Sequence, residues 1–430
     1  MKFWQKRVYA DAAAATPLAR GVLREMRRLE KHYANPGGLH AEAVAARGEL
    51  EHARSRAAEA ISAHADEILF TSGGTEANNL AIFGALRALL HEHGELNAIT
   101  TPIEHPSVLG PLRALEREGL YITYLPVDGE GVVEPKALRE ALNDETVFVS
   151  VQMVNSEVGT IQNIREIAKE IRHKRSLRKT TPQESGKSST KDFPTSGAGA
   201  PPYIPSKSFA SRPETLPLYF HTDASQAPLW LTLNVEKLGI DLMTLDAQKM
   251  MGPKSSGLLY VRRGVVLEPL LFGGGQEGGL RSGTENVVLA GAIAQALVEA
   301  QGGVEKRTVS VANARDYLWG EVKKHFPNAV IHGAQGEGRV ANNLNFSIPG
   351  LDGQMAVIAL DARGVAASTR SACSTTDESS SHVLQALGVV DKKAKEAIRI
   401  TLLPQASTHD SRVIVAALLK VADRYRNMIQ

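Results

Sequence analysis

Apolar runs of strand length alternate with longer helical patterns through the first two-thirds of this 430-residue chain. Three of these runs, at 67–71, 146–153 and 218–221, lead into a glycine-rich turn, into Asn155 and into Asp223. The alternation predicts a mostly parallel sheet with helices on both faces. In open α/β sheets the ligand lies beyond the carboxyl ends of the strands, so we expect these polar residues to converge on one crevice.

The pattern changes after about residue 265, where helices and shorter strands indicate a smaller α+β domain. We therefore predict a large α/β domain over 16–264 and a small domain formed by 1–15 and 265–430. Residues 174–217 crowd Ser, Thr, Pro, Gly and Lys together with few apolar residues. This composition is typical of a mobile insertion, and we expect it to have no catalytic part.

Composition narrows the class of protein. With 49 Lys and Arg against 47 Asp and Glu, the net charge of +2 gives no electrostatic reason to expect nucleic acid as the main partner. The basic residues of 174–212 leave docking of RNA or an acidic protein open, although a solvated linker explains the same composition. No stretch approaches the roughly 20 apolar residues of a membrane span, and residues 1–10 lack an apolar signal region, so we expect a cytoplasmic protein without a membrane partner.

Three motifs follow the predicted strands. The turn at 72–76 precedes a helix, so free N–H groups, including that of Gly74, and the Thr75 hydroxyl could hold a phosphate; an ordinary glycine turn is the alternative. Asp223 ends an apolar strand, where it either caps the next turn or pairs with a cation such as a protonated pyridine nitrogen. Lys249 follows the apolar strand 241–245, where partial desolvation suits a Schiff-base lysine better than a solvated surface lysine.

The motifs together resemble the class-V, fold-type I pyridoxal-phosphate enzymes, and specifically the NifS/IscS-type cysteine desulfurases. The resemblance covers nearly the whole chain and rests on the order and spacing of several short motifs. These are Tyr9-Ala-Asp11, Asn35-Pro36, Phe70 to Asn79, Glu104-His105, Val154 to Gly159, Asp223 to Gln226, Gly273 to Thr284, Ser371-Ala-Cys373 and Ile398-Arg399. The fold this implies has a mostly parallel seven-stranded sheet flanked by helices and a smaller α+β domain.

The resemblance also implies a role for each site residue. His105 would stack on the cofactor ring, Asn155 and Gln226 would bond its phenolic oxygen region, and Asp223 would pair with its ring nitrogen. Lys249 would carry pyridoxal phosphate. The cofactor phosphate would be bound by Gly74, Thr75, Asp246 and Gln248. Thr284 of a second subunit would also reach this phosphate, which implies a homodimer. Arg399, with Asn35, would bind the substrate carboxylate. No metal ligand is implied.

Cys373 is the only cysteine of the chain, and a solitary cysteine is more often a buried small residue than a nucleophile. Its neighbours from 366 to 382 are mostly polar, however, which is unusual for a core position. The resemblance implies that Cys373 accepts sulfur from L-cysteine as a persulfide, leaving alanine, and that the polar loop delivers this sulfur to an acceptor protein. An iron–sulfur scaffold or a tRNA-thiolation enzyme would be such an acceptor.

Two departures from the family pattern stand beside the cofactor lysine. Gln248 replaces a residue that is usually His, and Asp246 replaces one that is commonly Ser. An acidic side chain beside a phosphate is unfavourable unless it points away. A selenocysteine lyase or another class-V enzyme remains an alternative, as does a non-catalytic scaffold that binds sulfur-carrier proteins.

Overall fold

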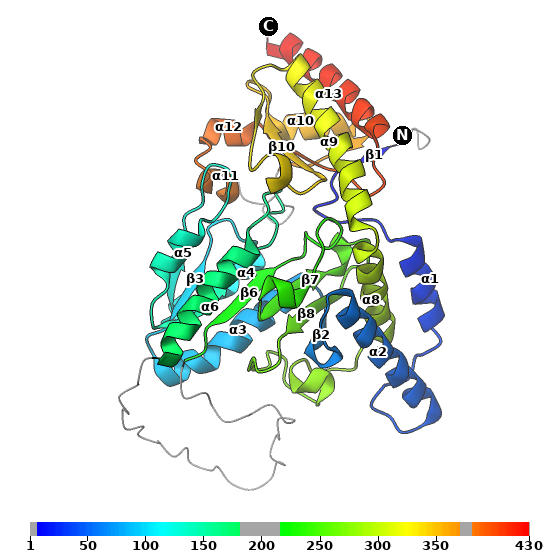
Figure 1. Cartoon of the computed structure of the whole chain (residues 1–430). Helices are drawn as coiled ribbons and strands as arrows, with labels where there is room; N and C mark the ends of the chain where they lie inside the picture. Colours follow the sequence, from blue (N-terminus) through cyan, green and yellow to red (C-terminus); the bar gives the residue numbers. More distant parts are fainter. Residues whose placement is uncertain (1–6, 181–215, 370–380, 430) are drawn as a thin grey trace.

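The computed structural model describes residues 7–180, 216–369 and 381–429, and a seven-stranded sheet forms its centre (Figure 1). Strand β8 runs antiparallel to both of its neighbours, and the remaining pairs in the sheet are parallel. From one edge to the other the strands are β2 (Ile68–Thr71), β8 (Gly257–Val261), β7 (Leu242–Asp246), β6 (Tyr219–Asp223), β5 (Thr146–Ser150), β3 (Asn97–Thr100) and β4 (Tyr121–Tyr124). The expected mostly parallel α/β sheet is confirmed.

Successive residues of the central strands are buried on opposite faces of the sheet. Val149 and Phe220 belong to one apolar cluster, whereas their neighbours Phe148 and Tyr219 belong to another. Helices α3 and α4 contribute to the second cluster, and α2, α6 and α8 contribute to the first. Because both faces are covered, the strands are mostly apolar, as is typical of buried parallel strands. The buried polar residues inside them, such as His221 and Thr244, are hydrogen-bonded to each other or to neighbouring strands. The candidate site lies at the carboxyl ends of the strands.

Helices surround this sheet on both sides (Figure 1). They are α1 (Arg20–Leu29), α2 (Ala41–Ala60), α3 (Gly74–His93), α4 (Pro106–Arg117), α5 (Pro135–Ala141), α6 (Ile164–Thr180), α7 (Val235–Leu238) and α8 (Val287–Gln301). Helix α3 contacts β6, β7 and β8, and its first residue lies just after the turn that follows β2. Its N-terminus therefore faces the carboxyl ends of the parallel strands.

The C-terminal part of the chain builds a second, smaller layer around strand β10 (Asn343–Ser347) (Figure 1). This strand pairs antiparallel with β9 (Val330–Ile331) and β12 (Ala397–Thr401). Near the N-terminus, β1 (Val8–Tyr9) pairs with β11 (Val365–Ala366). The helices of this layer are α9 (Val304–His325), α10 (Gly353–Asp361), α11 (His382–Ala386), α12 (Asp391–Lys395) and α13 (Thr408–Ile429).

The expected insertion begins later than the sequence composition predicted. Residues 174–180 continue helix α6 rather than forming a loop, which corrects the predicted start at 174. Their cationic side chains bind carbonyl groups of neighbouring segments: Arg175 donates to the Leu218 carbonyl at 2.9 Å, and Arg178 donates to the Thr146 carbonyl at 2.7 Å. Polar contacts of this kind leave no apolar period in the sequence. Residues 181–215 lie outside the described part of the chain.

Within the described residues, no single helix has both the length and the apolar character needed to cross a membrane. Helices α8 and α9 satisfy that criterion only when taken together, and they are bent by 72° at the break between them.

Candidate active site

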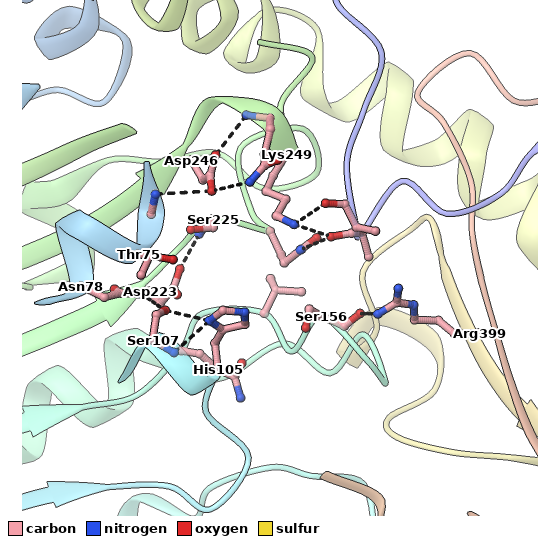
Figure 2. A pocket seen from close by; sticks show the side chains of 17 residues that line it. Thr75, Asn78, His105, Ser107, Ser156, Asp223, Ser225, Asp246, Lys249 and Arg399 are labelled. Atoms are coloured by element: carbon pink, nitrogen blue, oxygen red, sulfur yellow. Dashed lines mark hydrogen bonds between the residues drawn. The ribbon is translucent and has the colours of Figure 1, made fainter. Parts of the chain in front are cut away.

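A cavity of about 270 Å³ lies at the carboxyl ends of β6 and β7, beside the N-terminus of α3 (Figure 2). It brings together residues that are far apart in the sequence. The predicted site residues that line it are Gly74, Thr75, His105, Asp223, Gln226, Asp246, Gln248, Lys249 and Arg399. The convergence expected from the strand ends is thus observed.

Lys249 ends a short 3₁₀ turn, Ala247–Lys249, that directly follows β7. Its Nζ donates to the carbonyl oxygens of Ala13 and Ala14, at 2.9 and 2.6 Å. Gln226 Nε2 donates to the same Ala13 carbonyl at 2.9 Å. Two backbone carbonyls from the N-terminal segment therefore hold the amine at the wall of the cavity (Figure 2).

Asp223 is the last residue of β6, and two donors fix its carboxylate. Asn78 Nδ2 donates to Oδ2 at 2.8 Å, and the Ser225 N–H donates to Oδ1 at 2.9 Å. Both donors hold the carboxylate in a fixed orientation. The side chain lines the cavity, so it can face a cationic nitrogen bound there.

His105 is the N-cap residue of α4, and its ring lies at the cavity near Asp223 (Figure 2). Its Nδ1 accepts the Ser107 N–H at 3.1 Å and lies 2.7 Å from Ser107 Oγ. Burial lowers the pKa of His105, because a desolvated imidazole disfavours the charged form. The ring is accordingly neutral near pH 7, which suits stacking on an aromatic ligand.

The N-terminus of α3 provides backbone N–H groups at the other end of the cavity. Gly73 has a φ of 146°, a conformation that favours glycine, and it turns the chain into the helix. The Gly74 N–H points to Asp246 Oδ2, at 3.3 Å. A Cβ on Gly74 would lie 3.2 Å from that oxygen and 3.3 Å from Ser225 Oγ, so a larger residue there would require these side chains to shift by a few tenths of an ångström.

Arg399 projects from β12 of the small domain and is only 1% exposed. Its Nη2 donates to Asp11 Oδ1 at 2.8 Å, and its Nη1 donates to the Ser156 carbonyl at 3.3 Å. Its Nε has no hydrogen-bond partner within the described residues. A buried guanidinium with a donor to spare at the wall of the cavity is suited to binding a carboxylate.

Known proteins are similar to this chain along almost its full length. The sequence profile of the family described as aminotransferase class-V matches residues 8–178 and 204–410. The chain belongs to that family. A cysteine desulfurase IscS from Dictyoglomus turgidum is 36% identical over 429 residues, covering 99% of this chain and 96% of the relative.

Two solved structures extend the similarity to the fold. A NifS-like protein superimposes with a TM-score of 0.82 at 28% identity, covering 97% of this chain and 99% of its own. SspA in complex with cysteine superimposes with a TM-score of 0.73 at 29% identity, covering 92% and 99%. The resemblance to NifS/IscS-type cysteine desulfurases and the fold expected from it are confirmed.

Four predicted site residues of this class-V chain do not line the described cavity. The Asn155 side chain is buried, where Nδ2 donates to the Ile103 carbonyl at 3.1 Å and Oδ1 accepts two backbone N–H groups. Asn35 and Thr284 are exposed, away from the cavity. Cys373 lies outside the described residues. The functional roles of these four residues stay predictions.

Three residues at the site lie in the motifs that carry the resemblance but were given no role from the sequence. Asp11 binds Arg399, and Asn78 donates both to Asp223 and to Ser107 Oγ, at 2.8 Å each. Asn78 is 1% exposed, and its place four residues after Gly74, on the same face of α3, is the signal that could have revealed it. The third is Glu104, the residue before His105.

Glu104 is fully buried directly behind the cavity wall. Its Oε1 accepts hydrogen bonds from the Thr101 hydroxyl at 2.8 Å and from the Gln152 N–H at 2.9 Å. Oε2 has no hydrogen-bond partner within the described residues. Burial raises the pKa of Glu104 to about 8. The carboxyl is therefore largely protonated at neutral pH, because desolvation disfavours its charged form.

Proposed function

We propose that this protein is a pyridoxal-phosphate-dependent cysteine desulfurase, which converts L-cysteine to L-alanine and transfers the sulfur to Cys373. One observation carries the proposal: the Lys249 amine, the Asp223 carboxylate and the Arg399 guanidinium meet at a single cavity. An amine for an aldehyde, a carboxylate for a ring nitrogen and a cation for a substrate carboxylate are the groups that this chemistry requires. The similarity to named cysteine desulfurases supports the choice of substrate.

The residues present fit pyridoxal phosphate at both ends. Lys249 faces the cavity for the aldehyde, and Asp223 is fixed by Asn78 for the pyridine nitrogen. The neutral ring of His105 is available to stack on the pyridine, and the N-terminus of α3 supplies N–H donors for the phosphate. When bound, the cofactor supplies an electron sink for the carbanion formed at the substrate Cα.

The chain's own residues would bind and deprotonate the substrate. Arg399 binds the substrate carboxylate, and Asp11 keeps the guanidinium in place by accepting from Nη2. The Lys249 amine, displaced by the substrate amine, takes the proton from Cα and later returns a proton. Its anchoring carbonyls on Ala13 and Ala14 keep Nζ at the cavity wall between these steps.

Cys373 would perform the sulfur transfer. Its thiolate attacks the substrate sulfur, a sulfur–sulfur bond forms, the carbon–sulfur bond breaks, and its electron pair returns to carbon, which is then protonated to give alanine. The described residues that flank 370–380 support this role. Ser368 pairs with Arg399 through two backbone hydrogen bonds, and His382 Nε2 lies 3.2 Å from the Glu104 carbonyl. Both ends of the segment that contains Cys373 therefore start at residues beside the cavity.

The functional unit in this proposal is a homodimer. Large apolar side chains stand exposed in the segments that contain Asn35 and the predicted cross-subunit residue Thr284, which would be unfavourable in a monomer. Phe272 and Tyr33 are each 83% exposed, and Leu39 is 94% exposed. Tyr33 and Leu39 lie on either side of Asn35 in the sequence, and Phe272 precedes the segment Gly273 to Thr284. Light scattering should give twice the chain mass of 46.3 kDa, and a monomer at micromolar concentration would refute the dimer.

The acceptor of the sulfur would be an iron–sulfur scaffold protein or a tRNA-thiolation enzyme. The persulfide formed on Cys373 is the common donor for either. Capture of partners on the persulfide-loaded protein, compared with the unloaded protein, tests this part. Binding that ignores persulfide loading would argue against a sulfur-transfer partner.

Replacement of Lys249 tests the central assignment. Lys249→Ala should remove the visible absorbance of lysine-bound cofactor and stop alanine formation from L-cysteine. Lys254→Ala is the matched control, because Lys254 is exposed five residues later and lies outside the cavity. Retention of the absorbance by Lys249→Ala would refute the assignment.

Replacement of Cys373 tests the sulfur step separately. Cys373→Ser should leave the cofactor absorbance unchanged and abolish persulfide formation and sulfide release. Undiminished turnover of L-cysteine would remove Cys373 from the mechanism. Faster turnover of selenocysteine than of cysteine by the unaltered protein would instead indicate a selenocysteine lyase.

A further inference from the structure

The N-terminus of α3 already holds an anion supplied by the chain itself. Asp246, the last residue of β7, is 8% exposed, and its Oδ2 lies 3.3 Å from the Gly74 nitrogen. The same carboxylate accepts the Gln248 N–H at 3.1 Å through Oδ1 and Gln248 Nε2 at 3.1 Å through Oδ2 (Figure 2). Three N–H donors at the phosphate end of the cavity are thus directed at one carboxylate.

The contacts of the Asp246 carboxylate differ from those of Glu76, the other carboxylate at the N-terminus of α3. Glu76, in the first turn of α3, accepts the Ser72 N–H at 2.7 Å and pairs with Arg281 at 3.0 Å. Asp246 instead accepts from the Gly74 N–H and from the backbone and side-chain N–H groups of Gln248. The carboxylate is stabilised by N–H donors and the helix dipole, which are the groups that stabilise a bound phosphate.

Space at this end is also limited. Gly74 approaches Asp246 so closely that even a Cβ would lie 3.2 Å from Oδ2. A phosphate oxygen that accepts from the Gly74 N–H must therefore displace the carboxylate or lie against it. Two anions that share one set of donors repel each other, and one of them loses its hydrogen bonds.

We propose that Asp246 determines the affinity of this site for the phosphate of its cofactor, because it is a resident anion that must give up the α3 N-terminus before a phosphate can bind there. The proposal rests on the proposed function for the identity of the cofactor. It predicts that this chain binds the phosphate end more weakly than the same site without the charge. The affinity for a ligand that lacks the phosphate should not depend on Asp246.

The test compares ligands with and without phosphate on the cofactor-free full chain. Dissociation constants for pyridoxal phosphate, pyridoxal and inorganic phosphate are measured for the unaltered chain, Asp246→Ser and Asp246→Asn. Removing a charge a few ångströms from the phosphate should tighten pyridoxal phosphate and inorganic phosphate by about tenfold to a hundredfold. Pyridoxal should bind equally well to all three proteins.

Asp352→Asn is the matched control. Asp352 is the N-cap residue of α10, and its Oδ1 accepts the Met355 N–H at 2.9 Å, so the control removes a carboxylate from another helix N-terminus. It should leave all three dissociation constants unchanged. Asp246→Asn retains the shape of the side chain, so it still tests the proposal if Asp246→Ser folds poorly. The melting temperature of each protein reports on its folding.

The outcomes separate the two proposals. Unchanged or weaker phosphate binding in both Asp246 variants would overturn the role of Asp246, as would an equal gain for pyridoxal. Inorganic phosphate has no aldehyde and forms no covalent bond with Lys249, so this measurement does not depend on the lysine assignment. If Lys249→Ala kept the visible absorbance, the proposed function would fail while the phosphate measurements remained interpretable.

Discussion

The buried carboxyl of Glu104 makes a strong prediction about stability. Glu104 is 0% exposed, and its pKa is raised from 4.5 to about 8 by burial. Replacement by Gln keeps the shape and the acceptor for Thr101 and the Gln152 N–H while making the side chain permanently neutral. The substitution therefore isolates the proton that the buried carboxyl binds.

The magnitude follows from the two pKa values. Between pH 4.5 and pH 8 the unfolded chain loses the Glu104 proton and the folded chain keeps it, so stability falls as the pH rises. Each pH unit in that window costs about 1.4 kcal/mol, and the total from Glu104 approaches about 5 kcal/mol. Above pH 8 both states are ionised and this contribution no longer changes.

The assay is urea unfolding of the unaltered chain and Glu104→Gln at several pH values from 5 to 9. The difference in unfolding free energy, variant minus unaltered chain, should rise by about 3 kcal/mol between pH 5 and pH 7. Other titrating groups cancel in this difference. Glu140→Gln is the control, because Glu140 is an exposed residue paired only with Lys136 at 3.7 Å. A difference that stays flat from pH 5 to pH 8 would refute a protonated Glu104.

Three further changes test the contacts around the cavity. Arg399→Lys should raise KM for L-cysteine by about tenfold to a hundredfold, because an ammonium cannot bind a carboxylate with two parallel N–H groups; steady-state kinetics measure it, and an unchanged KM would refute the substrate role. Asp11→Asn should raise KM by a smaller factor with kcat nearly unchanged, since Arg399 would lose its carboxylate partner; a loss confined to kcat would contradict this. Asn78→Ala should weaken binding of pyridoxal as well as pyridoxal phosphate, because Asp223 loses a donor; equilibrium dialysis measures both, and unchanged constants would refute it.

Much of the site could be predicted because the sheet places it. Asp223 and Asp246 are the last residues of two adjacent parallel strands, and Lys249 follows three residues after the second. Apolar runs of strand length mark these positions in the sequence without any tertiary information. The polar residue that follows such a run is directed to the same edge of the sheet as its neighbours. That is why Lys249 and Asp223 were found together.

Contacts between distant segments could not be predicted in this way. Arg399 and Asp11 are 388 positions apart, and no local pattern connects them. Helix α6 was shortened in the prediction because Arg175 and Arg178 bind carbonyl groups rather than apolar partners, so its last residues show no hydrophobic period. Asp246 was predicted as a phosphate contact from the resemblance and was noted as a departure from the family pattern. Its contact with the Gly74 N–H required the folded chain.

The N-terminal segment around Ala12 to Ala14 connects the Lys249 amine to the strand that carries the Arg399 guanidinium. It is attached to β12, the strand that carries Arg399: the Ala12 N–H donates to the Thr401 carbonyl and the Ala13 N–H to Thr401 Oγ1, both at 3.0 Å. The carbonyls of Ala13 and Ala14 then accept from Lys249. One short run of alanines therefore connects β12, which carries Arg399, to Lys249, which follows β7.

The connection to Lys249 is made by backbone atoms. The carbonyl groups of Ala13 and Ala14 lie 2.9 and 2.6 Å from Lys249 Nζ. The contacts are made by the backbone, so the identity of the residues carries little sign of them in the sequence. Asp11, which immediately precedes the run of alanines in the sequence, binds Arg399. A shift of the small domain would therefore move the contacts of the Lys249 amine and of the Arg399 guanidinium together. The geometry for substrate binding and for proton transfer is thereby set by one segment.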